Sequence, residues 1–322
     1  GATVIVSCSR LTEPRRAHFK SLFRQHAGRN SSLHIVPLNQ GNLDDVSAFA
    51  QWVYNADFEV KGADRILIKA PWSPTLFFPF GAMPAEGDPT TLDQQLVDSL
   101  QVNLIGVEAL VGQLALQHRQ AGLKNPICTV LPLSPNHGQM GRDGLYAEAK
   151  IGLEALMQRR AAEFERWGKD VMLLGARIGW VRGTGLMAAL DRVYAKVEAD
   201  LGIQTFAPTE MADLILDSLP KEPRIATTAS PNVYDFTGGF SEAVGLRETI
   251  NQALALAARE TKPTNESFQS TLPYYQYSFP SLGEASRVKG TTSNLDDAIC
   301  IVGFGEVGPL GNARIRWDYE LN

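Results

Sequence analysis

The sequence has few cysteines, and they stand far apart, at Cys8, Cys128 and Cys300. That spacing forms neither a zinc knuckle nor a disulfide framework, and it suits a reducing compartment. The five histidines are also scattered, without the spacing of metal ligands. The composition therefore indicates neither a metal site nor a small disulfide-stabilised fold.

Long apolar runs and blocks of one charge are missing as well. We find no run of apolar residues long enough to span a membrane. The formal net charge is −5, with acidic and basic residues interspersed, so no broad face is expected to attract nucleic acid or an anionic membrane. No signal peptide is visible, although the chain begins at Gly1 and one could have been removed. We expect a cytoplasmic protein.

The sequence does contain enough apolar residues for a sizeable core, since hydrophobic residues make up 44% of 322. Up to about residue 222, strand-like segments alternate with amphipathic helical ones. Expected strands cover 2–9, 32–39, 64–70, 75–82, 126–134 and 169–180, and expected helices cover 13–27, 43–55, 92–119 and 144–167. Such alternation is typical of right-handed strand–helix–strand units. The predicted fold class is α/β, a doubly wound parallel sheet.

The character of the chain changes after residue 222. Segment 223–260 predicts a further short strand at 233–240 and a helix at 241–259. Residues 261–295 are rich in Ser, Thr, Pro and Asn and are interpreted as a linker. Its aromatic cluster either covers a domain surface or forms a contact between subunits: Tyr274, Tyr275, Tyr277 and Phe279. A new domain is predicted to begin in 296–322.

A glycine motif lies near the C-terminus. Gly303-x-Gly305-x-x-Gly308 follows the apolar run "AICIV" and has the spacing of a dinucleotide-binding turn. That fingerprint also needs a following helix and a second strand. Pro309 and Gly311 stand where the helix should begin, and the sequence ends at residue 322. We interpret the motif as a glycine-rich turn that binds no cofactor.

The stretch 131–150 carries the residues with the most evident chemistry. Ser134 is expected at the end of a strand, and Tyr146 and Lys150 stand four residues apart, on one face of a helix. A lysine ammonium stabilises a neighbouring phenolate and lowers the tyrosine pKa from its usual value near ~10. The tyrosine then becomes a proton donor to a developing alkoxide, while the serine hydroxyl holds the carbonyl oxygen.

A fourth residue, Asn103, lies in the middle of the long helix expected at 92–119. An asparagine in an apolar helical stretch is mildly costly, which favours a functional role. A tyrosine and a lysine four residues apart, taken alone, more often mark an ordinary pair on a helix surface. The serine 12 residues before Tyr146, together with Asn103, favours an enzyme over that reading.

Ser134, Tyr146, Lys150 and Asn103 resemble the catalytic tetrad of the short-chain dehydrogenases/reductases. Longer segments look like the β-ketoacyl reductase domain of type I fatty acid synthases of the fungal and mycobacterial kind: "FPFGAMPAEGD" (78–88), "LPLSPNHGQMGRDGLYAEAKIGLEAL" (131–156) and "IGWVRGTGLM" (178–187). In addition, "ICIVGFGEVGPLGNARIRWDYE" (299–320) resembles the beginning of the ketosynthase domain that follows the reductase there. The resemblance covers most of the chain and is weak over 224–295.

The resemblance implies a Rossmann-like reductase that converts 3-oxoacyl groups on acyl carrier protein into 3-hydroxyacyl groups with NADPH. In that reaction Tyr146 donates the proton and Ser134 positions the carbonyl. Lys150 also binds the nicotinamide ribose, and Asn103 holds a water of the proton relay. The implied partners are an acyl carrier protein with a phosphopantetheine-linked acyl chain and other segments or subunits of a homo-oligomeric synthase.

The end of the first expected strand indicates which nicotinamide cofactor is used. An Asp or Glu there would hold the ribose 2′-hydroxyl of NAD, but the chain reads "SCSR", without an acid. Ser9 and Arg10 can instead bind a 2′-phosphate through charge-assisted hydrogen bonds, which favours NADPH. Arg10 could also be an ordinary surface residue, and Arg15 and Arg16 are weaker candidates for the same contact.

Further cofactor contacts follow from the resemblance alone. It places Asn39 and Gln40 beside the adenine and lets Thr184 reach the carboxamide or a phosphate. It also makes the strand at 2–9 the second strand of the nucleotide-binding half. The first strand, its glycine turn and the first helix are then expected from another segment of the parent polypeptide, or the site is incomplete.

Other interpretations stay open on the sequence. The chain could be an inactive scaffold segment of the same synthase, or a stand-alone ketone reductase, against which the ketosynthase-like tail argues. His137 invites a Ser-His-Asp hydrolase, but there is no G-x-S-x-G elbow and no suitably placed acid before it. Asp143 and Glu148 are interpreted as helix-start and surface carboxylates.

Overall fold

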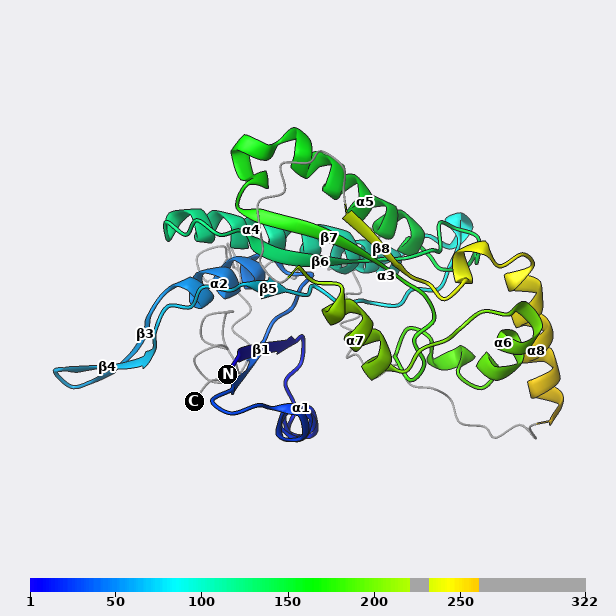
Figure 1. The fold of residues 1–322 in the computed structure, drawn as a ribbon, viewed down its shortest axis with the longest axis horizontal. Coiled ribbons are helices and arrows are strands. Elements are labelled where there is room, and N and C mark those ends of the chain that lie inside the picture. Colours follow the sequence, from blue (N-terminus) through cyan, green and yellow to red (C-terminus); the bar gives the residue numbers. More distant parts are fainter. Residues whose placement is uncertain (221–231, 261–322) are drawn as a thin grey trace, which may run out of the picture.

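The computed structural model describes residues 1–220 and 232–260. Within them, strands and helices alternate along the chain (Figure 1). The elements are β1 (Thr3–Cys8), α1 (Glu13–His26), β2 (Ser32–Pro37), α2 (Leu43–Tyr54), β3 (Asp57–Lys61), β4 (Asp64–Lys69), β5 (Leu76–Phe77), η1 (Pro89–Thr91), α3 (Gln94–Leu100), the π-helical turn η2 (Gln101–Ile105), α4 (Gly106–Gln120), β6 (Ile127–Leu133), α5 (Tyr146–Ala162), η3 (Phe164–Gly168), β7 (Val171–Ile178), η4 (Ala188–Leu190), α6 (Tyr194–Leu201), α7 (Pro208–Asp217), β8 (Asn232–Phe236), η5 (Phe240–Glu242) and α8 (Leu246–Glu260). The expected linker and the C-terminal glycine motif lie outside the described residues.

The parallel strands form two hydrogen-bonded groups. β1 pairs with β2, from Thr3 opposite Ser32 to Cys8 opposite Pro37. A four-stranded parallel sheet has the order β5-β6-β7-β8. In the described ranges no ladder links β1 or β2 to this sheet. The expected α/β class with parallel strands is confirmed.

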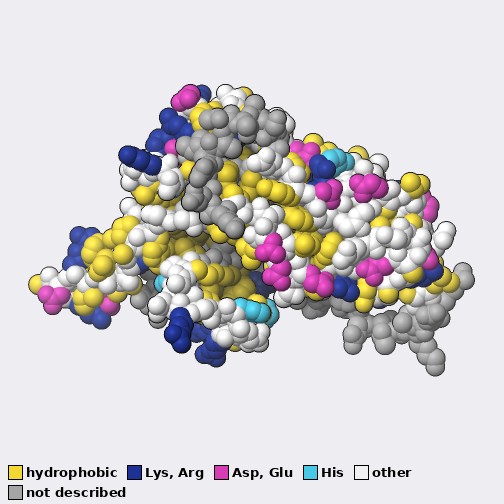
Figure 2. All heavy atoms as spheres, in the orientation of Figure 1, with side chains coloured by type: hydrophobic (Ala, Val, Ile, Leu, Met, Phe, Trp, Pro, Cys, Tyr) yellow, Lys and Arg dark blue, Asp and Glu magenta, His cyan; other side chains and the backbone are white. Residues whose placement is uncertain are grey.

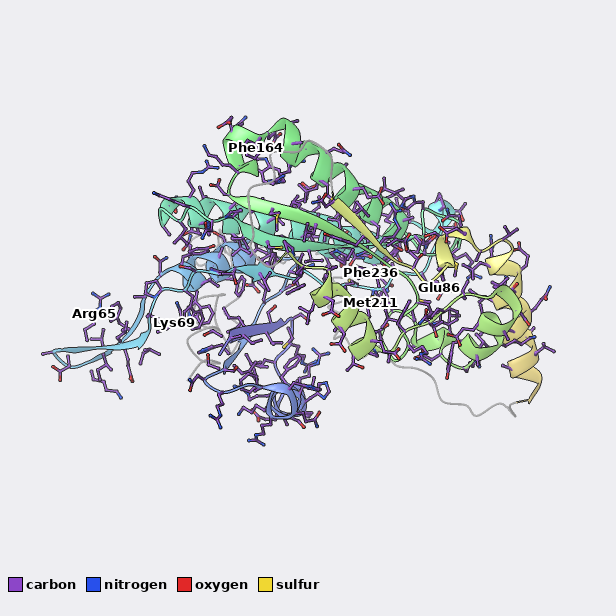
Figure 3. The ribbon with its side chains drawn as sticks, in the orientation of Figure 1. Arg65, Lys69, Glu86, Phe164, Met211 and Phe236 are labelled. Atoms are coloured by element: carbon purple, nitrogen blue, oxygen red, sulfur yellow. The ribbon has the colours of Figure 1, made fainter. Side chains whose placement is uncertain are left out.

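Helices cover both faces of the four-stranded sheet. Leu131 of β6 packs against Val107 of α4 in one buried cluster. Val130, on the opposite face, packs in a cluster with Met211 of α7 and Phe236 of β8 (Figure 3). Because successive side chains of a strand point to opposite faces, every residue of β6 is buried. The doubly wound arrangement expected from the alternating pattern is therefore confirmed.

α2 connects the β1–β2 pair to the rest of the molecule. Val46 and Val53 of α2 share one buried cluster with Val36 of β2, Leu110 of α4 and Ile127 of β6. The side chain of Asn42 caps the start of α2 by accepting hydrogen bonds from the backbone. One apolar core thus holds β2 and β6 in the same body.

The segment 64–70, expected as a strand of the parallel sheet, is instead half of a hairpin. β4 pairs with β3 in antiparallel orientation, with Lys61 opposite Asp64. Gly62 has φ +64°, which suits the first position of a two-residue hairpin loop. The hairpin projects from the body (Figure 1), and apolar side chains gather on it (Figure 2); those exposed are Val60, Ile66, Leu67 and Ile68. An apolar run alone does not distinguish a buried strand from this exposed one.

β5 is also shorter than expected. Only Leu76 and Phe77 pair with β6, whereas the sequence predicted a strand over 75–82. Pro79 has no N–H to donate to a ladder, so the chain leaves the sheet there. The loop that follows runs toward Met83 and α3.

The helix expected at 92–119 is continuous but contains the π turn η2. α3, η2 and α4 together form Gln94–Gln120, 27 residues that are long and apolar enough to cross a membrane by those two criteria. The sequence-based statement that no such run exists was therefore wrong. In this fold the helix packs against α2 and α5, and 44% of its most apolar window is buried inside the protein.

A small lobe containing α6 and α8 lies beyond the sheet (Figure 1). Its buried cluster includes Trp180, Val197 and Ile250. The expected strand at 233–240 is β8, which pairs in parallel with β7, and the helix expected at 241–259 is α8. The segment after β8 therefore brings a helix to the same end of the molecule as the loop that follows β6.

Candidate active site

Ser134 follows the last residue of β6 and is only 7% exposed. Its Oγ accepts a hydrogen bond of 3.1 Å from the backbone N–H of Asn136. Its hydroxyl also lies near the Tyr146 side chain and acts to lower the pKa of that phenol. The serine therefore stands where α/β proteins bind their ligands, at the carboxyl end of a parallel strand.

Tyr146 and Lys150 lie one turn apart at the start of α5, as expected. The Nζ of Lys150 is 5.3 Å from the centroid of the Tyr146 ring. It also donates a hydrogen bond of 2.8 Å to the carbonyl oxygen of Pro132, near the end of β6. The structure thus brings three of the four predicted catalytic residues together.

Burial governs the ionisation of this pair. It lowers the pKa of the Lys150 ammonium to about 8. It raises the pKa of the Tyr146 phenol, the neighbouring Ser134 hydroxyl acts to lower it, and the charge of Asp143 raises it further. The expectation that Tyr146 has a lowered pKa is therefore wrong for this structure. Desolvation of the phenolate outweighs its stabilisation, and the lysine directs its hydrogen bond to Pro132.

Asn103 lies in the π turn η2 and is 1% exposed. Its Oδ1 accepts a hydrogen bond of 2.8 Å from Met83 N, and its Nδ2 donates to Met83 O at 2.9 Å and to Ser99 Oγ at 3.0 Å. The amide therefore clamps the loop after β5. Within the part of the chain that the structure describes, none of its hydrogen bonds reaches the other three residues, so its role in a water relay stays a prediction.

The loop between β6 and α5 is built by two residues to which the sequence analysis gave no catalytic role. Asn136 Oδ1 accepts hydrogen bonds of 3.2 Å from the backbone N–H groups of both Gly138 and Met140. Its Nδ2 donates to the Asp143 carboxylate at 2.8 Å, and the Asp143 carbonyl accepts from Tyr146 N at 3.1 Å. The "NHG" sequence is a turn signal that could have identified Asn136.

His137, in the same loop, does not form a hydrolase triad with Ser134. Its Nε2 lies 3.1 Å from a carboxylate oxygen of Glu154 on α5. Arg177 of β7 contacts the same carboxylate at 3.3 Å. His137 therefore ties the loop to the helix that carries the tyrosine and the lysine.

Ser9 and Arg10 follow the last residue of β1, and both are exposed. The Arg10 carbonyl accepts a hydrogen bond of 3.0 Å from Arg15 Nη1. Among the described residues no carboxylate pairs with the Arg10 guanidinium, whereas Arg16 pairs with Glu13 at 3.4 Å. An unpaired guanidinium beside a hydroxyl, with no acid at this strand end, fits the 2′-phosphate of NADPH.

Asn39 and Gln40 follow β2 and differ in what their side chains do. Gln40 Nε2 donates hydrogen bonds to Gly81 O at 3.1 Å and to Val102 O at 2.8 Å, so it joins the end of β2 to the loop after β5. Asn39 is exposed at the same edge. Gln40 therefore has a structural role that the resemblance did not imply. Contact of Asn39 or Gln40 with adenine stays a prediction.

Thr184 lies in the loop after β7, and its Oγ1 donates to Val181 O at 2.9 Å. All the predicted site residues other than those on helices thus follow the carboxyl ends of β1, β2, β6 or β7. Across residues 1–220 and 232–260, no three His, Cys, Asp or Glu side chains gather into a metal site.

This arrangement can protonate a substrate carbonyl oxygen. The Ser134 hydroxyl is close enough to the Tyr146 hydroxyl to affect its pKa, so a carbonyl oxygen at that point can accept hydrogen bonds from both. The ammonium of Lys150 is close enough to stabilise the phenolate that remains after proton transfer. These are the protein groups that a carbonyl reductase needs.

Relatives with established names match nearly the whole chain, although no family model matches it. The fatty acid synthase alpha subunit stcJ of Emericella nidulans is 37% identical over 343 residues, which cover 99% of this chain and 21% of that protein. The fatty acid synthase subunit alpha of Saccharomyces cerevisiae is 30% identical over 352 residues, covering 99% of this chain and 18% of that protein. The chain therefore spans about a fifth of the length of these relatives.

Solved structures share the fold. A short chain dehydrogenase/reductase family protein has a TM-score of 0.52 and 19% identity, covering 75% of this chain and 88% of its own. The actinorhodin polyketide ketoreductase with NADPH has a TM-score of 0.53 and 17% identity, covering 74% and 97%. A gluconate 5-dehydrogenase from Burkholderia cenocepacia in complex with NADP and tartrate has a TM-score of 0.54 and 15% identity, covering 76% and 87%. The chain therefore has the fold of the short-chain dehydrogenases/reductases and is similar, over nearly its whole length, to a segment of fatty acid synthase alpha subunits.

Proposed function

We propose that this chain reduces the 3-keto group of an acyl thioester, carried on an acyl carrier protein, to a 3-hydroxy group with NADPH. The observation that carries the proposal is the group Ser134, Tyr146 and Lys150 at the end of β6. The similarity to fatty acid synthase alpha subunits supports the acyl substrate and the carrier as partners. It also supports assembly with other parts of such a synthase.

The chain's own residues supply the acid catalysis. NADPH, when bound, supplies the hydride that adds to C3 of the substrate. Ser134 and Tyr146 hold the carbonyl oxygen, and Tyr146 transfers its proton to that oxygen as negative charge develops. The raised pKa of Tyr146 keeps the donor protonated at neutral pH before the reaction. Lys150, charged below a pKa of about 8, stabilises the phenolate that is left.

The choice of NADPH rests on the end of β1. Arg10 and Ser9 are exposed there, and no acidic side chain competes for the ribose. Lys150 and Thr184 would contact the nicotinamide half of the cofactor, as the resemblance implies. A guanidinium and a hydroxyl bind a phosphate dianion more strongly than they bind a neutral ribose hydroxyl, which favours NADPH over NADH.

The test is Tyr146→Phe in the full-length protein, with reduction of a 3-oxoacyl thioester followed by the loss of NADPH absorbance. Removing the proton donor should lower turnover by about 10²–10⁴-fold and leave NADPH affinity little changed. Tyr234→Phe, on β8, is the matched control and should keep normal turnover. Near-native turnover in the Tyr146 variant would refute the assignment, as would a wild-type protein that reduces no 3-oxoacyl thioester.

A further inference from the structure

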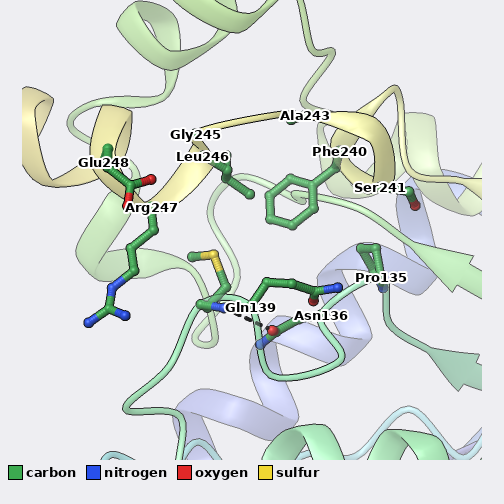
Figure 4. Close-up of a pocket in the computed structure, with 11 residues that line it drawn as sticks. Pro135, Asn136, Gln139, Phe240, Ser241, Ala243, Gly245, Leu246, Arg247 and Glu248 are labelled. Atoms are coloured by element: carbon green, nitrogen blue, oxygen red, sulfur yellow. Dashed lines mark hydrogen bonds between the residues drawn. The ribbon is translucent and has the colours of Figure 1, made fainter.

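Asn136 lies between the two catalytic hydroxyls in sequence, in the loop from β6 to α5, next to Pro135 (Figure 4). Its backbone N–H donates a hydrogen bond of 3.1 Å to the Oγ of Ser134. Its side-chain Nδ2 donates to the carboxylate of Asp143 at 2.8 Å, and the Asp143 carbonyl accepts from Tyr146 N at 3.1 Å. One residue therefore contacts the serine directly and the first turn of the tyrosine's helix through a single intermediate.

The residue type at position 136 fits both contacts. The Asn136 Oδ1 accepts hydrogen bonds of 3.2 Å from the N–H groups of Gly138 and Met140, which is a turn that an aspartate forms as well. An ionised aspartate, however, has no N–H to donate and would repel the Asp143 carboxylate. The amide of asparagine closes the turn and binds Asp143 at the same time. The turn alone therefore does not account for an asparagine here.

The backbone of Asp143 is fixed independently of Asn136. Asp143 forms a parallel bridge with Gly87, in the loop after β5, and the two hydrogen bonds of this bridge are 3.1 and 3.2 Å long. Among the described residues no cation pairs with the Asp143 carboxylate, so its direction depends on the Asn136 amide. Burial and then the charge of this carboxylate raise the pKa of Tyr146. The carboxylate that Asn136 holds therefore lies close enough to act on the phenol.

We propose that Asn136 is a positioning residue for the reduction, which sets the distance between the hydroxyls of Ser134 and Tyr146. Its backbone holds the serine oxygen, and its side chain holds Asp143 at the start of α5. The proposal rests on the proposed function and adds a residue outside the catalytic group. Because the substrate carbonyl must accept hydrogen bonds from both hydroxyls at once, a small change in their separation reduces proton transfer. Loss of the Asn136 side chain should therefore lower kcat more than it raises KM.

The test uses variants of the full-length protein, assayed by reduction of a 3-oxoacyl thioester with NADPH. Asn136→Ala should lower kcat by about 10–100-fold, the size expected when reacting groups move by up to about 1 Å. KM and the dissociation constant of NADPH should stay within about threefold of the wild type. The matched control is Gln139→Ala, which removes an amide of the same loop whose oxygen accepts from His137 N at 2.7 Å. This control should keep kcat within about twofold of the wild type.

An exchange of donor and acceptor tests the contact itself. Asn136→Asp keeps the turn but places two carboxylates against each other, so it should lower kcat at least as much as Asn136→Ala does. Asp143→Asn keeps the hydrogen bond, because the Asn136 amide can donate to an amide oxygen, and should lower kcat less than Asn136→Asp does. The double variant Asn136→Asp/Asp143→Asn rebuilds the hydrogen bond with donor and acceptor exchanged. Its kcat should return to within about threefold of that of Asp143→Asn.

Wild-type kcat in Asn136→Ala would overturn the proposal. Equal losses in Asn136→Ala and Gln139→Ala would also overturn it, because kcat would then follow a general loosening of the loop. A double variant that is no faster than Asn136→Asp would do the same. If Asn136→Ala does not fold, the comparison of Asn136→Asp with the double variant still decides, since both keep the turn. A wild type that reduces no 3-oxoacyl thioester would instead refute the proposed function, and this inference with it.

Discussion

The ammonium of Lys150 donates a hydrogen bond of 2.8 Å to the carbonyl oxygen of Pro132, two residues before Ser134. This contact fixes the first turn of α5 against the strand end that carries the serine. The ammonium has three N–H donors, and burial favours its neutral form. The Lys150 ammonium, whose charge stabilises the Tyr146 phenolate, therefore titrates close to neutral pH.

Turnover should fall as the pH rises through about 8, because Lys150 loses its proton there and no longer stabilises the phenolate. The raised pKa of Tyr146 keeps the phenol protonated over the same range, so the loss can be assigned to the lysine. The measurement is kcat between about pH 7 and about pH 9. In Lys150→Arg, any remaining turnover should be flat over that interval, because a guanidinium does not deprotonate. A flat wild-type profile would contradict the prediction.

Arg10→Ala should weaken NADPH binding by roughly 1.5–3 kcal/mol and leave NADH binding unchanged, because only NADPH carries the 2′-phosphate. The measurement is the ratio of the two dissociation constants. Lys20→Ala, an exposed cation on α1, serves as the control for a general loss of positive charge. If the ratio does not change in Arg10→Ala, the phosphate is bound elsewhere, with Arg15 and Arg16 next in line.

Asn103→Ala should lower the free energy of unfolding by roughly 1–3 kcal/mol, because it leaves the N–H of Met83 without its partner and removes one of the two hydrogen bonds to Met83 O, the other coming from Ser99 Oγ. Gln101→Ala, in the same π turn, makes no such contact and should cost less than about 1 kcal/mol. Denaturant unfolding of the two variants distinguishes them. Equal stability of the two would show that the clamp on Met83 contributes little and that the asparagine serves another purpose.

Gly106→Ala should destabilise the protein, because a Cβ there would lie 2.0 Å from the carbonyl oxygen of Gln40. The start of α4 would have to move away from the loop after β2, at a cost of roughly 1–3 kcal/mol. Gly112→Ala is the matched control on the same helix, with nothing within 4 Å of the added carbon. It should stabilise the helix by up to about 1 kcal/mol. Thermal unfolding should therefore shift in opposite directions for the two variants.

The parts of this molecule that could be predicted from sequence depend on local patterns. The strand end at Ser134 and the spacing of Tyr146 and Lys150 are features of one short stretch, and the structure preserves both. The parallel sheet with helices on both faces followed from the alternation of periodicities along the chain. None of these inferences required knowing which distant residues come into contact.

The sequence-based predictions that failed concern features that the tertiary structure determines. An apolar run such as 64–70 is compatible both with a central strand of the sheet and with the exposed hairpin that β3 and β4 form. The sequence alone therefore could not distinguish these two structures. The partner of Asn103 is Met83, which only tertiary packing brings near. The direction of the Tyr146 pKa shift is set by burial, and burial is a property of the assembled site.

In the central helix, the number of residues in the π turn η2 determines how α3 packs, as much as the side chains there do. Gly106 N–H bonds to Gln101 O, five residues back, so the ladder contains one more residue than a regular α-helix would. Each residue of an α-helix advances by about 100°, and the extra one sets the rotational phase of α3 relative to α4. That phase brings Leu96 against Gly144. Deleting a single residue from this turn would rotate α3 as a unit and uncouple it from the start of α5, whereas most substitutions in the turn would not.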